Sequence, residues 1–382
     1  YAILRYLERG ETWVLFLFTA VNALHFTDKA TSYMFAAEEF LFLLFYVVDR
    51  ITRREWKMPR RRIFFLLGLA IAVVFLAAAA GYYLANKPTA DSPAEQVRTM
   101  IIIVSLLSAG AAGALAWAGV ALVRGLGWEE IRSERSADLL ILLGTFILPL
   151  LAAIPIKLMG YTPLDYTTSG MLRVAGVAAI LAIIGIAIGL WWFGRKWLYH
   201  AALFFVPFIL LYSTFFTYPQ GILGGLVGAL SYWTEQQAVA RGGQPLYYYV
   251  LLLIPMYEFL GALGTVIAAG IATFTRLWQS EPGKPFTRPQ PDSGQPPVPV
   301  AALLVFWSVS SLAVFTYAGE KMPWLTIHIA LPMILACAWG ICGGGAGESQ
   351  VLDARVLGSG FEVQRGCCEC RRGVGGSSVV WR

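Results

Sequence analysis

Three short polar segments, far apart in the chain, carry the side chains whose types could do chemistry. These segments are Asp28-Lys29, Arg241–Gln244 and Glu320-Lys321. Lysine and arginine are the side chains that most often hold phosphate groups, and a carboxylate can take a proton from a hydroxyl group. The residue types therefore favour a site for a phosphorylated or hydroxylated ligand.

The elements that must position these side chains are membrane-spanning helices. Ten apolar stretches run between Trp13 and Cys342, and a helix needs roughly 20 apolar residues to cross a hydrocarbon core about 30 Å thick. Of the 382 residues, 58% are hydrophobic and 14% are charged, whereas an average soluble domain has about 25% charged residues. The composition predicts an all-α, polytopic membrane protein. We expect spans at residues 12–26, 33–48, 63–84, 99–123, 138–158, 171–193, 197–217, 247–274, 299–318 and 325–342.

The distribution of basic residues predicts the orientation of these spans in the membrane. Loops on one side, of which Arg50–Arg62 is the richest, hold fifteen lysines and arginines, and the other side holds seven. The positive-inside rule places the first set in the cytoplasm. The basic loops are therefore topology signals and not a nucleic-acid site. All three polar segments then lie on the extracytoplasmic side of a cytoplasmic membrane.

Changes in composition divide the chain into four parts. Residues 1–274 form a membrane helix bundle, with an outer loop at residues 218–246. Residues 275–298 form a Pro-rich cytoplasmic linker, residues 299–342 form a C-terminal transmembrane hairpin, and residues 343–382 form a tail without an assigned fold, either disordered or frameshifted. The cysteines of the tail lack the second pair of ligands that a zinc site needs, so the sequence indicates no metal and no cofactor.

The outer loop at residues 218–246 is longer than most connections in compact proteins, which are either functional or disordered at this length. It contains Tyr232, Trp233 and Glu235, and this richness in aromatic and hydrogen-bonding side chains argues against disorder. Residues 221–240 could form an amphipathic helix at the membrane interface.

Three carboxylates fall inside the predicted spans. Glu38 and Glu39 lie in the second span, and Glu258 lies near the middle of the span at 247–274. Such a group is costly in lipid and normally faces a cavity or a partner. At least one of Glu38 and Glu39 should point into the bundle, either as a functional group or as a hydrogen-bonded structural one.

Several segments resemble a known family. The hairpin Leu24–Thr31 resembles the Thr-Lys-Glu turn of GT-C membrane glycosyltransferases in the protein O-mannosyltransferase and aminoarabinose-transferase superfamily. Two further segments are similar to a branch of multispanning proteins labelled flippase-activity-associated. These segments are Tyr232-Trp233 with Ala240–Tyr249, and Tyr317–Thr326. The likeness covers about residues 1–342.

The resemblance implies a GT-C-like bundle that transfers a sugar from a polyprenyl-phosphate carrier to an extracytoplasmic acceptor. By this analogy Lys29 contacts the donor phosphate, although Asp28 and Ala30 replace the Thr and Glu that flank the family's lysine. The catalytic base of such enzymes lies in the first outer loop. We expect that loop upstream of Tyr1, because the chain opens without a methionine and reads as an N-terminally truncated fragment.

The transfer reaction needs cationic groups for the leaving lipid phosphate and polar groups for the sugar and its acceptor. The candidates for the lipid phosphate are Lys29, Arg241 and Lys321. The candidates for sugar or acceptor contacts are Asp28, Tyr232, Trp233, Glu235, Gln244, Glu320 and Trp324. The expected partners are a polyprenyl-phosphate-linked sugar and membrane lipid.

Two rival functions remain open. A lipid-linked-sugar flippase or transporter predicts charged residues along a path through the bilayer and usually an internal repeat, whereas the chain has only the three deep carboxylates and no visible repeat. A non-catalytic membrane assembly partner would need no polar cavity on the extracytoplasmic side.

Overall fold

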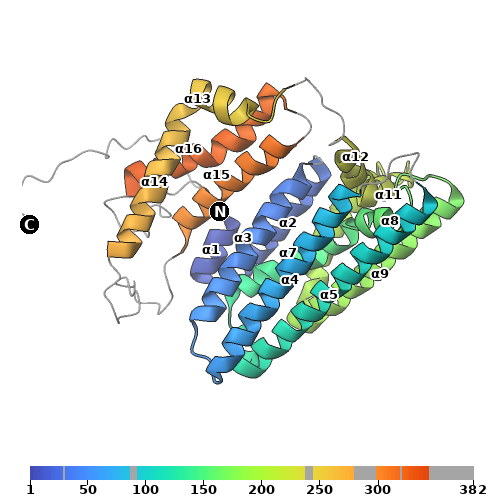
Figure 1. Cartoon of the computed structure of the whole chain (residues 1–382), viewed down its shortest axis with the longest axis horizontal. Coiled ribbons are helices and arrows are strands. Elements are labelled where there is room, and N and C mark those ends of the chain that lie inside the picture. The colour runs from blue at the N-terminus through green and yellow to red at the C-terminus, as the bar shows by residue number, and fades with distance from the viewer. Residues whose placement is uncertain (29–30, 87–92, 237–243, 279–297, 319–320, 344–382) are drawn as a thin grey trace, which may run out of the picture.

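A computed structural model describes residues 1–28, 31–86, 93–236, 244–278, 298–318 and 321–343 (Figure 1). Every element in these ranges is a helix. Those of the first half are α1 (Ala2–Arg9), α2 (Thr12–Asp28), α3 (Ser32–Arg53), α4 (Pro59–Ala85), α5 (Ala94–Leu126), α6 (Trp128–Arg132), α7 (Arg135–Leu150), α8 (Ala153–Leu158) and α9 (Thr168–Phe193). Those of the second half are α10 (Lys196–Tyr212), α11 (Gly221–Leu223), η1 (Gly224–Gly228), α12 (Ala229–Gln236), η2 (Tyr248–Leu253), α13 (Ile254–Tyr257), α14 (Phe259–Trp278), α15 (Val300–Tyr317), η3 (Pro323–Leu325) and α16 (Thr326–Gly343).

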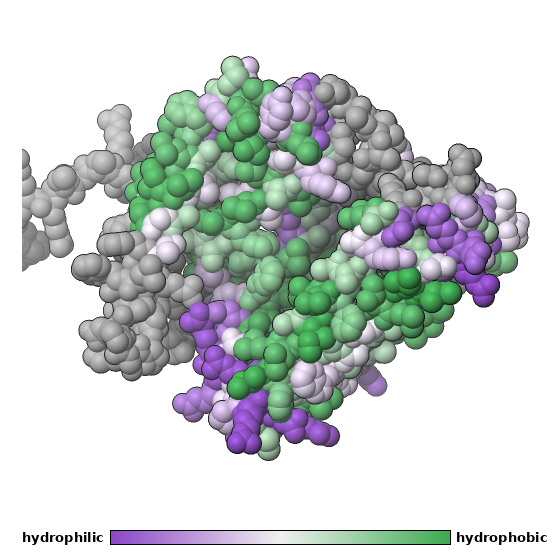
Figure 2. Space-filling model, viewed as in Figure 1, coloured by the Kyte–Doolittle hydropathy of each residue, from purple (hydrophilic) through white to green (hydrophobic). Residues whose placement is uncertain are grey.

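Within the described ranges, five helical stretches are long and apolar enough to cross a membrane. They are α4, α5, α9, α15 and Pro323–Ile341, and a bent pair starting at Tyr248 makes a sixth if it counts as one span. Most side chains of α4, α5 and α9 are exposed. Figure 2 shows hydrophobic side chains over the helices and hydrophilic ones gathered at the lower end and the upper right. Helices whose apolar faces stay uncovered are those of a membrane protein.

The helices begin and end close to the predicted spans, with three differences. The stretch predicted as one span at 138–158 is two helices, because α7 ends at Leu150 and α8 begins at Ala153. Pro149 and Pro155 flank this break, and proline cannot donate the backbone hydrogen bond that continues a helix.

The second difference concerns α10, which ends at Tyr212 and not at Thr217. Thr214, Phe215 and Phe216 follow with φ angles of 49°, 53° and 66°. Three consecutive non-glycine residues in the left-handed region cannot continue a right-handed helix. They turn the chain sharply before α11 begins.

The third difference concerns the span predicted at 247–274. The helical stretches Tyr248–Tyr257 and Phe259–Thr273 meet at an angle of 101°. Glu258 lies at this corner with a non-helical conformation (φ −122°, ψ 21°). The helix predicted at 247–274 is therefore bent at Glu258, which lies at a corner and not within a straight helix.

The predicted outer loop is helical from Gly221 to Gln236, where α11, η1 and α12 follow one another, and its position at the membrane interface stays a prediction. Residues 237–243 lie outside the described ranges. So do most of the predicted Pro-rich linker, at residues 279–297, and nearly all of the predicted tail, at residues 344–382. The division into four parts stays a prediction.

Helices α7 and α9 approach closely because α9 carries a glycine at the contact. A Cβ atom at Gly185 would lie 2.8 Å from the backbone oxygen of Thr145 on α7. Gly176, on the same helix, has open space around it. The two glycines therefore form a matched pair for testing this contact.

We expect Gly185→Ala to lower the free energy of unfolding by about 1–3 kcal/mol, because the backbone of α7 must shift to admit the methyl group. Gly176→Ala should be neutral or slightly stabilising, since alanine favours a helix by about 1 kcal/mol over glycine. Thermal unfolding of both variants in one detergent measures the difference. Equal effects would show that the close contact does not limit stability.

An ion-pair network joins α3 to the start of α7 at the end of the bundle that carries the Arg50–Arg62 loop. Arg54 binds Glu134 at 2.9 Å and Glu130 at 2.7 Å, and Arg50 lies 3.6 Å from Glu134. Glu134 is only 4% exposed, and it also accepts a hydrogen bond from Ser136 at 2.9 Å. The buried carboxylate is thus surrounded by donors.

A second polar contact at the same end joins three helices through Asp138 of α7. One carboxylate oxygen accepts from the hydroxyl of Tyr6 on α1 at 2.6 Å, and the other accepts from the indole N–H of Trp192 on α9 at 2.7 Å. Burial, assisted by the charge of Asp138, raises the pKa of the Tyr6 phenol. Tyr6 therefore remains a hydrogen-bond donor at neutral pH.

The orientation in the membrane is a separate prediction. Cysteines placed singly in the Arg50–Arg62 loop should resist an impermeant thiol reagent added to intact cells, because that loop is expected in the cytoplasm. A cysteine at Gln244 should react. The converse labelling pattern would reverse the orientation of every span.

Candidate functional site

Three segments that are far apart in sequence pack together in one cluster, which we call the α3–α16 junction. Its buried residues are Met34, Tyr249, Ile254, Phe315, Leu325, Ile329 and Met333. They come from three segments, which are the start of α3, the η2–α13 stretch, and the hairpin formed by the end of α15 and the η3–α16 stretch. Along the chain, each of the three predicted polar segments ends within a few residues of a junction residue, namely Met34, Tyr249 or Leu325.

A hydrogen bond fixes one side of this junction. The side chain of Tyr249 is fully buried, and its hydroxyl donates to the backbone oxygen of Met322 at 3.0 Å. Tyr249 follows the outer loop, whereas Met322 lies in the turn between α15 and α16. This bond holds the two segments together and was not foreseen from the sequence.

A row of aromatic rings extends from the junction to α2. The ring of Phe35 lies 5.0 Å from His25 and 5.3 Å from His328, and His328 stacks on Phe315 at 5.2 Å. His25 is within one turn of Asp28 at the end of α2. Two histidines from opposite ends of the chain thus flank one phenylalanine, close to the end of α2 at Asp28.

Lys321 has a partner within the backbone. It is 6% exposed, and its ammonium group donates to the carbonyl oxygen of Ala318 at 2.7 Å. Ala318 is the C-cap of α15, where the helix leaves carbonyl groups unpaired and where a positive charge is favourable. In this structure Lys321 is buried and its ammonium group closes the end of a helix.

The remaining candidate residues are spread over two regions. Asp28 is exposed at the end of α2, Trp324 is 62% exposed beside the junction, and Gln244 is exposed. Tyr232 is 50% exposed on α12. Leu230 of the same helix and Val227 of η1 pack against α8 and α9. The α12 segment is therefore not part of the α3–α16 junction.

The last five candidates fall into two groups. Trp233 and Glu235 belong to α12, and Lys29, Arg241 and Glu320 lie outside the described ranges. The roles of all ten candidates stay predictions.

Glu38 points into the bundle, as one of the two adjacent glutamates was expected to do. It is 5% exposed, and the hydroxyl of Ser311 on α15 donates to its two carboxylate oxygens at 3.0 and 3.2 Å. This contact gives the carboxylate a partner and joins α3 to α15.

Comparisons of this chain with protein-family models, with curated proteins and with solved structures gave no match. Within the described residues, no three His, Cys, Asp or Glu side chains gather as a metal site would require. Among the described residues, the groups around the α3–α16 junction that could contact a ligand are therefore hydrogen-bonding groups, aromatic rings and single charged side chains.

Proposed function

We propose that this protein is a GT-C-type membrane glycosyltransferase that transfers a sugar from a polyprenyl-phosphate carrier to an extracytoplasmic acceptor. In this proposal the shorter helices also cross the membrane, so that the bundle has about ten spans. The supporting observation is the α3–α16 junction, where the hairpin after Leu24, the segment ending at Tyr249 and the turn around Met322 meet. These are the segments on which the family resemblance rests.

The proposed roles follow the family resemblance, with one change for Lys321. Lys29 and Arg241 are the primary candidates for the lipid phosphate, because Lys321 already caps α15 through Ala318. Lys321 then shapes the turn that carries Glu320 and Trp324. The exposed indole of Trp324 offers a flat surface for a sugar or for the membrane interface. No described residue is assigned as the catalytic base.

One observation favours the rival function of a lipid-linked-sugar flippase. Glu38 is a buried carboxylate within the helix bundle, and ionisable groups at such positions often line transport paths. Its contact with Ser311 is also what a structural carboxylate makes. An assay in vesicles separates the two functions, because transfer releases free polyprenyl phosphate and flipping does not.

The proposal is tested by Lys29→Ala in the full-length protein. Its rate of sugar transfer should fall tenfold or more, which corresponds to about 1.4 kcal/mol of lost transition-state stabilisation. Folding should be nearly unchanged, because Asp28 is exposed and surface ion pairs contribute about 0–1 kcal/mol. The readout is release of polyprenyl phosphate from a radiolabelled polyprenyl-phosphate sugar.

Asp28→Asn serves as the control, and its transfer rate should fall less than that of Lys29→Ala. Full transfer by Lys29→Ala, together with a lower melting temperature, would show that Lys29 has a structural role only. Wild-type protein that moves the lipid-linked sugar between leaflets without releasing polyprenyl phosphate would favour the flippase.

A further inference from the structure

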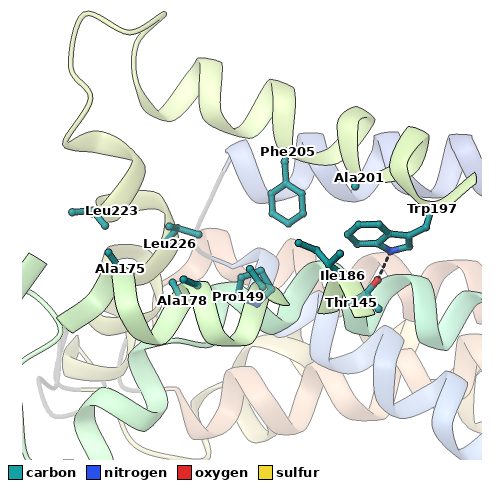
Figure 3. A pocket seen from close by; sticks show the side chains of 12 residues that line it. Thr145, Pro149, Ala175, Ala178, Ile186, Trp197, Ala201, Phe205, Leu223 and Leu226 are labelled. Carbon is teal, nitrogen blue, oxygen red and sulfur yellow. Dashed lines mark hydrogen bonds between the residues drawn. The ribbon is translucent and has the colours of Figure 1, made fainter. Parts of the chain in front are cut away.

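A second feature lies away from the α3–α16 junction, on the other side of the bundle. A cavity of about 490 Å³, open on one side, is lined by α7, α9, α10 and the α11–η1 stretch (Figure 3). Five of its twelve lining residues are alanines, and the rest are apolar apart from Thr145. None of the helices of the junction contributes to it. The cavity is therefore a separate site.

The alanines on α9 explain why the cavity exists. Ala175, Ala178, Ala179 and Ala182 recur with helical spacing and form one face of α9. Farther along, Gly185 allows α9 to touch the backbone of α7. The helices are close at the glycine, and the small side chains leave the space beside it unfilled.

The lining offers a ligand no free polar side chain. The hydroxyl of Thr145 donates to the carbonyl of Leu142 at 2.9 Å and accepts from the indole N–H of Trp197 at 3.0 Å. Both polar groups are thereby satisfied, and Figure 3 shows them together at one end of the cavity. A polar ligand would lose its hydrogen bonds to water without replacement. The occupant must be apolar.

The shape of the cavity indicates a single chain. Figure 3 shows Leu223 and Ala175 at one end and Ile186 and Trp197 at the other. Ala175 and Ile186 are eleven residues apart on a helix, which corresponds to a length of about 16 Å. One leaflet of the hydrocarbon core is about 15 Å deep. The cavity is thus about as long as one leaflet is deep, which is the length of one acyl chain.

The volume agrees with this length. An apolar cavity of about 150 Å³ holds one benzene ring, so the 490 Å³ found here accommodates roughly three such groups, or about eighteen carbon atoms. Ala175, Ala179 and Ile186 remain exposed, and α9 is one of the helices able to cross a membrane. The open side of the cavity therefore faces the hydrocarbon of the bilayer.

We propose that this cavity binds one acyl chain of a bilayer phospholipid, whose head group lies at the Leu223 end and whose chain ends against Trp197. The indole of Trp197 closes the cavity at the end opposite Leu223 (Figure 3). A polyprenyl chain is longer than one leaflet and would extend past this end. The site is independent of the proposed sugar transfer, because the two share no residue.

The test uses a phosphatidylcholine with a diazirine at the end of one acyl chain. The full-length protein is reconstituted with this lipid, irradiated, and digested for peptide mass spectrometry. Trp197 is only 3% exposed, whereas Val206 on the same helix is 52% exposed. Label on Trp197 therefore reports a chain inside the cavity, and label on Val206 reports surrounding lipid.

We expect label on both residues in the wild type. In Ala182→Phe, label on Trp197 should fall about tenfold, equivalent to about 1.4 kcal/mol of binding, with no change at Val206. Ala201→Phe, which fills the same space from α10, should have the same effect. Ala187→Phe adds an identical side chain at an exposed position of α9 outside the lining and should label as the wild type does.

Three outcomes would overturn the proposal. The first is a wild-type protein in which Trp197 is not labelled, and the second is unchanged label on Trp197 in folded Ala182→Phe and Ala201→Phe. The third is loss of the label in the presence of polyprenyl phosphate but not of an equal amount of unlabelled phosphatidylcholine. That result would assign the cavity to the polyprenyl chain.

Discussion

Glu134→Ala is expected to lower the free energy of unfolding by about 1.5–3 kcal/mol, because Arg50 loses its carboxylate partner and Arg54 keeps only that of Glu130. Glu134 lies 2.9 Å from Arg54 and 3.6 Å from Arg50, and it is almost fully buried. Removing it also leaves the hydroxyl of Ser136 without its acceptor. Unfolding in a detergent micelle, followed by circular dichroism, measures the loss.

The matched control is Glu130→Ala, which removes another carboxylate bound to Arg54. The side chain of Glu130 is 54% exposed, and ion pairs in contact with water contribute about 0–1 kcal/mol. The two glutamates share one arginine and differ mainly in burial. Equal losses in the two variants would contradict the view that burial makes the Glu134 contact strong.

Asp138→Ala is expected to cost about 2–6 kcal/mol, because two donors lose their acceptor and each buried unpaired group costs about 1–3 kcal/mol. Those donors are the hydroxyl of Tyr6 and the indole N–H of Trp192, whose residues are 6% and 4% exposed. The variant should loosen α1 and α9 from α7 together. Thermal unfolding and hydrogen exchange of residues 2–9 give independent readouts.

A double-mutant cycle shows whether the cost arises from the unpaired donors. Tyr6→Phe alone removes one donor and should cost about 0.5–1.5 kcal/mol. In the Asp138→Ala background, Tyr6→Phe should cost less or restore stability, because the donor it removes is already unpaired. Strictly additive losses would place the cost of Asp138→Ala elsewhere, for example in the packing of its side chain.

The positions of the helices could be predicted because the apolar stretches are long and continuous. The breaks could not, because their causes lie outside hydropathy. The stretch around Pro149 and the corner at Glu258 are as apolar on average as a straight span. The turn at Thr214, Phe215 and Phe216 contains no glycine, the residue that usually indicates such a turn in a sequence. Hydropathy predicts which residues lie in lipid, but it does not predict where the backbone changes direction.

The candidate site was only partly accessible to the same reasoning. The segments that meet at the α3–α16 junction were singled out, since they carry unusual residues beside apolar stretches. The position of Phe35 between His25 and His328 depends on how α2, α3 and α16 pack, which no local pattern specifies. The contact between the Lys321 ammonium group and the carbonyl of Ala318 was not predicted, because the sequence does not specify the conformation of a long, flexible side chain.

The ion-pair network around Glu134 has a consequence for biogenesis. Arg50 and Arg54 belong to the loop whose positive charge is expected to retain that end of the chain in the cytoplasm during insertion. The same two side chains later hold Glu134 in the folded bundle. Neutralising them to study insertion would therefore also weaken the mature protein, and the two defects would be difficult to separate. Lys57 and the arginines at 60–62, which are mostly exposed, allow the insertion signal to be altered while the folded contacts remain.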